Sequence, residues 1–143
     1  MKVLDLNVLL YAVNRDSAPH RRAKAWLDGL LSGEEAVAIP WVVLLGFLRL
    51  TTNARIMPRP LAPAQALTVV DGWLAAPSVV PLHPGEEHWR ILRELLAASG
   101  TAGNLTPDAH LAALAIEHGC ELCSADGDFA RFPALRWTNP LAG

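Results

Sequence analysis

KVLDLNVLLYAV, residues 2–13, changes from a strand pattern to a helix pattern at a single carboxylate, Asp5. The apolar run before Asp5 is short, and from Val8 to Val13 the apolar residues recur with helical spacing. We therefore predict a buried strand, a functional turn and a helix. In an open parallel α/β sheet, ligands bind beyond the carboxyl ends of the strands, so Asp5 stands where a binding site is expected.

The rest of the chain continues this alternation of strands and helices. We expect buried strands at residues 36–39, 79–82 and 121–124 and a short further strand at 135–137. The expected helices, marked by apolar spacing and by proline or glycine at their ends, cover residues 19–33, 40–52, 63–76, 86–98 and 107–118. Strands that alternate with helices form a parallel sheet covered on both faces. The predicted fold is α/β, with a central parallel sheet of four to five strands flanked by helices.

Length and composition fit a single domain over residues 1–143, because 52% of the residues are hydrophobic and the chain has room for one core. The longest apolar stretch, residues 36–48, is interrupted by Pro40 and is shorter than the roughly 18 to 20 residues that cross a bilayer. The N-terminal residues lack the apolar run of a signal peptide. We expect a cytoplasmic protein without a membrane partner.

The charge distribution favours a site for an anionic substrate. The net charge is −2, so the protein as a whole is not basic and its overall charge does not attract nucleic acid. Residues 1–60 carry eight Lys or Arg and five acids, whereas residues 61–143 carry four Lys or Arg and nine acids. This asymmetry allows a basic rim beside an acidic pocket, as a metal-using phosphodiesterase requires; a solvated surface of mixed charge is the alternative.

Four aspartates are expected at one edge of the predicted sheet. Asp5 follows the first strand, Asp126 and Asp128 follow the strand at 121–124, and Asp108 lies in the first turn of the helix before that strand. Taken alone, Asp108 also suits a helix N-terminus and Asp126 also suits a turn, so their joint placement carries the argument. Such a cluster repels itself unless a cation neutralises it, and carboxylate oxygens select Mg²⁺ or Mn²⁺.

This predicted metal site indicates phosphodiester hydrolysis. Divalent ions held by carboxylates bridge phosphate oxygens, lower the pKa of a bound water and stabilise the leaving oxygen of an in-line displacement. We therefore expect a metal-dependent hydrolase whose acidic cluster supplies the catalytic residues.

Four segments then show a family resemblance. DLNVLLYA at 5–12, FLRLTTN at 47–53, DAHLAALAIEHG at 108–119 and SADGDFARF at 124–132 together resemble the PIN-domain toxins of the VapC type, in matching order and spacing. The resemblance implies a magnesium-dependent endoribonuclease, with manganese as a substitute. It also implies a homodimer that a cognate VapB-type antitoxin holds inactive.

Carried over by position, the resemblance implies roles for particular residues. Asp5 and Asp108 are implied as metal ligands, and Asp126 and Asp128 complete the acidic cluster, with Asp126 as a third ligand. All four are expected to be catalytic. The implied supporting residues are an amide that orients Asp5, a small hydroxyl residue beside the site and a basic residue, which are Asn7, Ser124 and Arg49.

At one position the chain departs from the family pattern. Many PIN domains place a Glu three residues before the basic residue, where this chain has Gly46, and no other acid lies between Glu35 and Asp71. One interpretation is that the remaining aspartates suffice for cleavage. The alternative is a catalytically weakened PIN-like module that binds RNA or a protein partner.

Other catalytic patterns fit less well. DLNV resembles a haloacid-dehalogenase phosphatase motif, but Asn7 cannot act as the general acid of that reaction. A serine hydrolase built on Ser124, His110 and Asp108 would lack the GxSxG elbow, and we interpret His110 as a helix-face residue.

Two further clusters have simpler explanations. HPGEEH at 83–88 lacks the HExxH pattern of zinc proteases, so we interpret it as a solvated helix start. CELC at 120–123 has no second CxxC to complete a zinc site, so its cysteines are expected to be ordinary thiols.

The helix expected at 40–52 is apolar almost all round. A surface helix normally has a polar face, so this helix must be covered on more than one side. Either it is a fully buried central helix, or part of it meets a second copy of the chain or a helix of the antitoxin.

Overall fold

Four parallel strands form the central sheet within residues 1–100 and 102–142, the part of the chain that this computed structural model describes. The sheet order is β2-β1-β3-β4, and the strands are β1 (Lys2–Leu4), β2 (Val37–Ala38), β3 (Glu121–Cys123) and β4 (Arg136–Thr138). Thr101, in the segment between the predicted helices at 86–98 and 107–118, and Gly143, at the end of the predicted domain, lie outside the described residues. The predicted parallel α/β sheet is confirmed.

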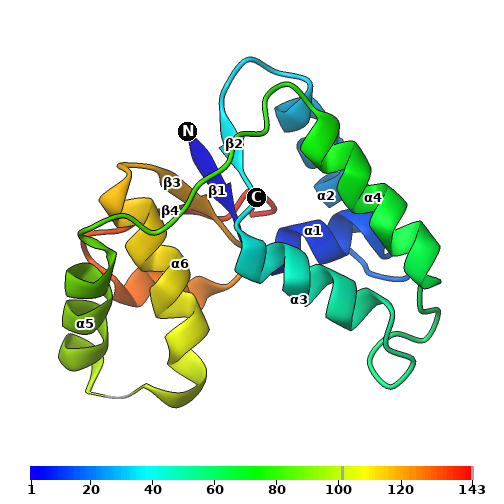
Figure 1. Ribbon diagram of the computed structural model, residues 1–143. Coiled ribbons are helices and arrows are strands. Elements are labelled where there is room, and N and C mark those ends of the chain that lie inside the picture. Colours follow the sequence, from blue (N-terminus) through cyan, green and yellow to red (C-terminus); the bar gives the residue numbers. More distant parts are fainter. Residues whose placement is uncertain (101, 143) are drawn as a thin grey trace.

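Helices surround this sheet as expected. They are α1 (Leu6–Val13), α2 (His20–Leu31), α3 (Trp41–Thr51), α4 (Pro63–Ala75), α5 (His88–Ser99) and α6 (Thr106–Glu117). Two short 3₁₀ helices, η1 (Gly103–Leu105) and η2 (Gly127–Arg131), were not predicted. In Figure 1, α5 and α6 form one arm of an arch, α3 and α4 form the other, and the sheet lies where the two arms meet.

The prediction of a strand at 79–82 is wrong. Only Val79 forms a bridge, with Val37, and two backbone hydrogen bonds of 2.9 Å join Val37 to Ser78 and Val80. Pairing ends there because β2 is two residues long and Pro81 has no N–H to donate. The strand predicted at 135–137 is present as β4, one residue further along the chain.

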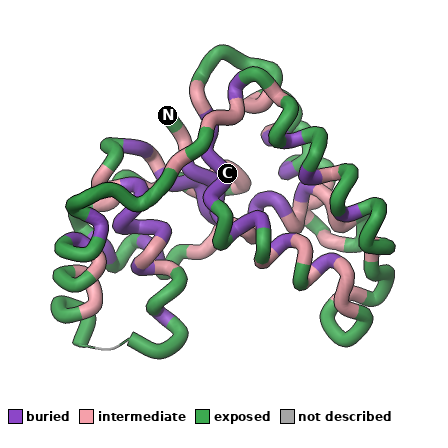
Figure 2. Tube along the Cα trace, viewed as in Figure 1, coloured by how far each residue is buried: buried purple, intermediate pink, exposed green. Residues whose placement is uncertain are grey.

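The core lies where the two arms meet, as the buried segments in Figure 2 show. Leu4 of β1 and Leu122 of β3 are fully buried, and α6 buries an almost unbroken run from Ala109 to Ala115. This burial explains why α6 shows no polar face in its middle turns. Cys120 and Cys123 are buried free thiols, which confirms that interpretation.

The helix α3 is only partly covered. It buries Val43, Leu44 and Phe47, and the Phe47 ring packs on Trp73 of α4 with ring centroids 4.7 Å apart. Trp41 is 58% exposed and Leu45 is 61% exposed. The interpretation of a fully buried central helix is therefore wrong. None of the helices within the described residues is long and apolar enough to cross a bilayer.

Shortening a buried side chain in the central strand β3 tests this description of the core. We expect Leu122→Ala to lower the free energy of unfolding by about 3 kcal/mol, because it leaves a cavity in a closely packed site. The matched control, Leu67→Ala on α4, removes a side chain that is 53% exposed and should cost less than about 0.5 kcal/mol. Urea titration measures both values, and equal losses would contradict the assignment of the core.

Candidate active site at the carboxyl edge of the sheet

Asp5 lies at the junction of β1 and α1 and caps that helix. Its Oδ1 accepts a hydrogen bond of 2.7 Å from the Leu6 N–H, and its Oδ2 accepts one of 2.7 Å from Ser124 Oγ. The parallel register pairs Leu4 with Cys123, so the next residues, Asp5 and Ser124, lie side by side where the two central strands end. Asp5 is only 8% exposed, so its carboxylate is held in one orientation.

Asn7 connects the ends of both strands. Its Nδ2 donates to Asp5 Oδ2 at 3.3 Å and to Ser124 Oγ at 3.1 Å, while its Oδ1 accepts from the Ala125 N–H at 3.0 Å. Ser124 Oγ also accepts from the Asp126 N–H at 3.0 Å. The buried serine hydroxyl therefore uses its one donor and both acceptor positions. The structure thus places Asn7 and Ser124 against Asp5, as the sequence predicted.

Asp108 lies close enough to each of the other three aspartates to interact with it electrostatically. Asp126 caps η2, and its Oδ1 accepts from the Asp128 N–H at 2.9 Å. Burial and the negative charges of Asp5, Asp126 and Asp128 raise the pKa of Asp108 to about 6, while Arg131 opposes the rise. Burial, with a contribution from the charge of Asp126, also raises the pKa of Asp5 against the opposing hydrogen bonds from Ser124 and Leu6. The four carboxylates thus form one cluster, and the nearby positive charge does not balance their negative charge.

The donor set of this cluster fits a hydrated divalent cation. Among the described residues, no three His, Cys, Asp or Glu side chains stand close enough together to enclose a metal ion. Mg²⁺ does not need such a cage, because it keeps several waters and binds through one or two carboxylates. A cavity of about 380 Å³, lined in part by Asp108 and Asp128, offers room for the ion and its waters.

Arg49 and Gly46 lie outside the cluster. Arg49 is exposed in the last turn of α3 and forms no hydrogen bond or ion pair with the residues that the structure describes. Gly46 has a packing role, because a Cβ placed there would lie 2.8 Å from Cδ2 of Leu6, the residue after Asp5. A Glu at this position would have to push the Leu6 side chain away from α3.

Sequence reasoning missed two features, one beside the cluster and one between α5 and α6. Arg131 of η2 lines the same cavity as Asp108, and only an unpredicted helical turn brings it there. His88 was expected in a solvated helix start but is 8% exposed, and its Nε2 lies 3.0 Å from Nδ1 of His110. A burial pattern read from a single sequence does not reveal such a pairing across α5 and α6.

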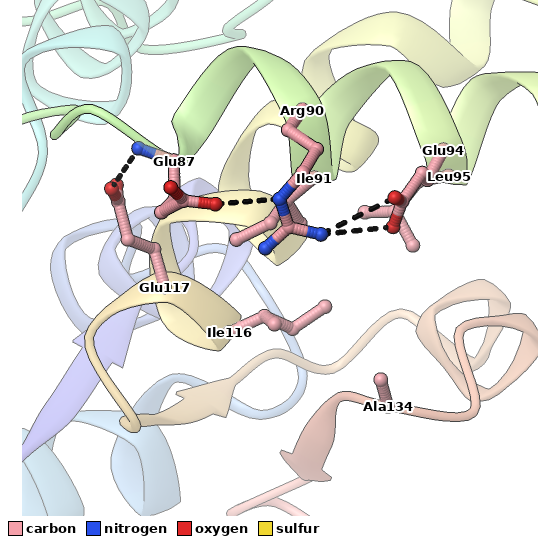
Figure 3. Close-up of a pocket in the computed structure, with 8 residues that line it drawn as sticks. All are labelled: Glu87, Arg90, Ile91, Glu94, Leu95, Ile116, Glu117 and Ala134. Atoms are coloured by element: carbon pink, nitrogen blue, oxygen red, sulfur yellow. Dashed lines mark hydrogen bonds and ion pairs between the residues drawn. The ribbon is translucent and has the colours of Figure 1, made fainter.

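A second hollow lies at the opposite end of α6 from Asp108. Figure 3 shows it between α5, the end of α6 and Ala134. Its Glu117 accepts from the N–H groups of Gly85 at 2.8 Å and Glu87 at 2.9 Å, and Arg90 pairs with Glu87 and Glu94. These carboxylates already have partners, and the contacts of Glu117 hold the start of α5 against α6. This hollow therefore does not resemble a metal site.

The PIN domain family model matches residues 2–135 of the chain, a range that includes all four aspartates of the cluster. The chain therefore belongs to the PIN-domain family. It is similar to "Ribonuclease VapC37" of Mycobacterium tuberculosis, with 51% identity over 142 residues, which is 99% of each chain.

Solved structures share the fold at lower identity. VapBC-1 from nontypeable Haemophilus influenzae matches with a TM-score of 0.70 and 16% identity over 99% of this chain and 98% of that one. VapBC-5 from Mycobacterium tuberculosis, described as a member of the VapBC family of toxin-antitoxin systems, matches with a TM-score of 0.54 and 22% identity over 96% and 94%. The relative with 51% identity over the full chain confirms the resemblance to the VapC type noted in the sequence.

Burial of Asp108 and repulsion by its neighbours predict a pH-dependent gain in stability when its charge is removed. The pKa of Asp108 rises from 3.8 to about 6 on folding, so the folded chain binds more protons across that window and loses stability as the pH rises through it. In metal-free protein, Asp108→Asn should therefore stabilise the fold by up to about 1 kcal/mol at pH 7.5, allowing for solvent screening. The gain should vanish at pH 4.

Thermal denaturation in EDTA at the two pH values measures this effect. Asp71→Asn, which removes an exposed carboxylate from α4, serves as the control and should give no comparable gain. An Asp108→Asn protein that is equally stabilised at both pH values, or destabilised at pH 7.5, would refute the electrostatic coupling.

Proposed function

We propose that the protein is the toxin of a type II toxin-antitoxin system and acts as a magnesium-dependent endoribonuclease that hydrolyses RNA phosphodiester bonds. The observation that carries the proposal is the cluster of Asp5, Asp108, Asp126 and Asp128, in which burial and the neighbouring negative charges raise the pKa of Asp108 to about 6. The name of the relative, "Ribonuclease VapC37", supports RNA as the substrate. Residues 1–143 would act as one PIN domain, and cellular RNA as substrate would place it in the cytoplasm.

The roles that we propose for the site residues follow from their contacts at the strand ends. Asp5, Asp108 and Asp126 would hold a hydrated Mg²⁺, with one or two of them bound directly and the rest through its waters, and Mn²⁺ would be a substitute. Asp128 would complete the acidic cluster. When bound, the ion supplies a water of lowered pKa and positive charge for the phosphate. Asn7 and Ser124 fix Asp5 Oδ2 through hydrogen bonds of 3.3 and 2.7 Å, so this oxygen is positioned before any ligand arrives.

The competing proposal is a catalytically weakened module that binds RNA or protein. Gly46, in place of the Glu that many PIN domains have, is the observation in its favour. The close packing of Gly46 on Leu6 explains why a glycine stands at this position, without any loss of activity. We therefore favour the active enzyme, and a cleavage assay separates the two proposals.

A partner is proposed for the apolar face of α3, formed by Trp41, Val42 and Leu45. All three side chains are exposed, and a contiguous apolar surface of this kind marks an interaction site. We propose that a second copy of the chain and a helix of a VapB-type antitoxin cover this face and the adjoining groove between α3, α4 and residues 79–83. A basic side chain of the antitoxin would reach the aspartates and displace the metal ion.

Loss of either proposed metal ligand should abolish cleavage. We expect Asp5→Asn and Asp108→Asn to slow RNA cleavage about a thousandfold, which corresponds to about 4 kcal/mol of transition-state stabilisation. Asp71→Asn should cleave like the wild type.

Activity should return when Mg²⁺ or Mn²⁺ is added to the EDTA-treated wild type. The products should carry 5′-phosphates, because water attacks, and sequencing of the product ends measures this. Full cleavage in excess EDTA, or cyclic phosphate ends, would exclude this mechanism.

The apolar face of α3 should control assembly. Light scattering at micromolar concentration should find a dimer for the wild type and a monomer for Leu45→Asp, since a buried carboxylate in the interface would lack a partner. Ile56→Asp, a change at another exposed apolar residue, serves as the control and should remain dimeric. A monomeric wild type that also forms no complex with the product of the adjacent gene would refute the proposed partners.

A further inference from the structure

Arg131 stands beside the acidic cluster without neutralising any one carboxylate fully. It belongs to η2 and lines the cavity of about 380 Å³ together with Asp108, Asp128 and the segment from Ala102 to Leu105. It is the only basic residue among the described residues that line this cavity. A single cation at the edge of four acids invites a functional explanation.

The geometry holds the guanidinium in place and leaves its outer donors available. Arg131 Nε donates to the backbone carbonyl of Asp128 at 3.1 Å, which fixes the inner part of the group. The closest carboxylate oxygen, Asp128 Oδ1, lies 4.0 Å from Nη2, beyond hydrogen-bond distance. The terminal N–H groups of Arg131 have no hydrogen-bond partner among the described residues, and the side chain is 44% exposed.

An RNA phosphate would need such a group at this place. The four aspartates repel an incoming phosphodiester, and one divalent ion offsets only two of their charges. A guanidinium contributes a further positive charge and presents parallel N–H donors that match two phosphate oxygens. Its bond to the Asp128 carbonyl reduces the conformational freedom that binding would otherwise have to remove.

We propose that Arg131 binds a phosphodiester group of the RNA strand in this cavity and thereby positions the strand beside the aspartates. The inference rests on the proposed function, because it takes RNA as the substrate. It goes beyond that proposal by assigning a substrate-binding residue that lies outside the acidic cluster.

Binding to a fluorescent single-stranded RNA tests this role without cleavage. In an Asp5→Asn background with Mg²⁺ present, adding Arg131→Gln should weaken RNA binding about tenfold, as for the loss of a charge-assisted hydrogen bond. The slope of log K against log[salt] should fall in magnitude by about 0.7, the value for one phosphate contact on a single strand. Arg131→Lys, which keeps the charge, should recover most of this slope.

Arg21→Gln is the matched control, because Arg21 is exposed on α2 and lines none of the cavities near the aspartates. It should change neither the affinity nor the salt slope. A purely structural Arg131 would show a lower melting temperature for Arg131→Gln with an unchanged salt slope, and this result would overturn the inference.

Cleavage assays separate the failure of this inference from failure of the proposed function. In the otherwise wild-type enzyme, Arg131→Gln should raise KM more than it lowers kcat. If the wild type cleaves RNA while Arg131→Gln has the same KM, only the assignment of Arg131 fails. If the wild type neither cleaves RNA nor binds it, the proposed function fails first.

Discussion

The hydrogen bond of 2.7 Å from Ser124 Oγ to Asp5 Oδ2 joins the ends of the two central strands and fixes the geometry around them. Asn7 bonds to both partners, and the Asp126 N–H donates to the same serine hydroxyl. Asp5 and Ser124 are buried, and Asn7 and Asp126 are partly buried. The bond between the two buried groups forms in a low-dielectric environment where leaving a polar atom unpaired is costly. The direction of α1 and the start of η2 both follow from this small network.

The same network concentrates negative charge, and the rest of the fold must compensate for it. Asp5 is almost fully buried, and burial together with the charges of the other carboxylates raises the pKa of Asp108 to about 6. The compensation comes from apolar burial, since β1, β3 and the middle of α6 contribute fully buried side chains directly behind the acidic edge. Charge repulsion at the site is therefore offset by the close packing behind it, as in many active sites.

The parts of the fold that sequence predicts are those with a local signal. The strand-to-helix change at Asp5, the glycine and proline at helix ends, and the aspartates after the first strand and after the strand at 121–124 all follow from spacing. The strand at 79–82 failed because an apolar run does not reveal that its neighbour, β2, has only two residues to pair with. Arg131 was missed because a 3₁₀ turn, which has no clear sequence signal here, brings it to the aspartates. The burial of His88 likewise depends on a partner, His110, that lies on another helix.

The central claim is that the aspartate cluster lacks positive charge until a divalent ion binds. The most direct measurement is calorimetric titration with Mg²⁺ or Mn²⁺ in buffers of different ionisation enthalpy, which counts the protons released for each ion bound. With the pKa of Asp108 at about 6, binding at pH 6 should release about half a proton per ion, and binding at pH 8 should release almost none. An absence of binding, or binding at pH 6 without proton release, would contradict the account.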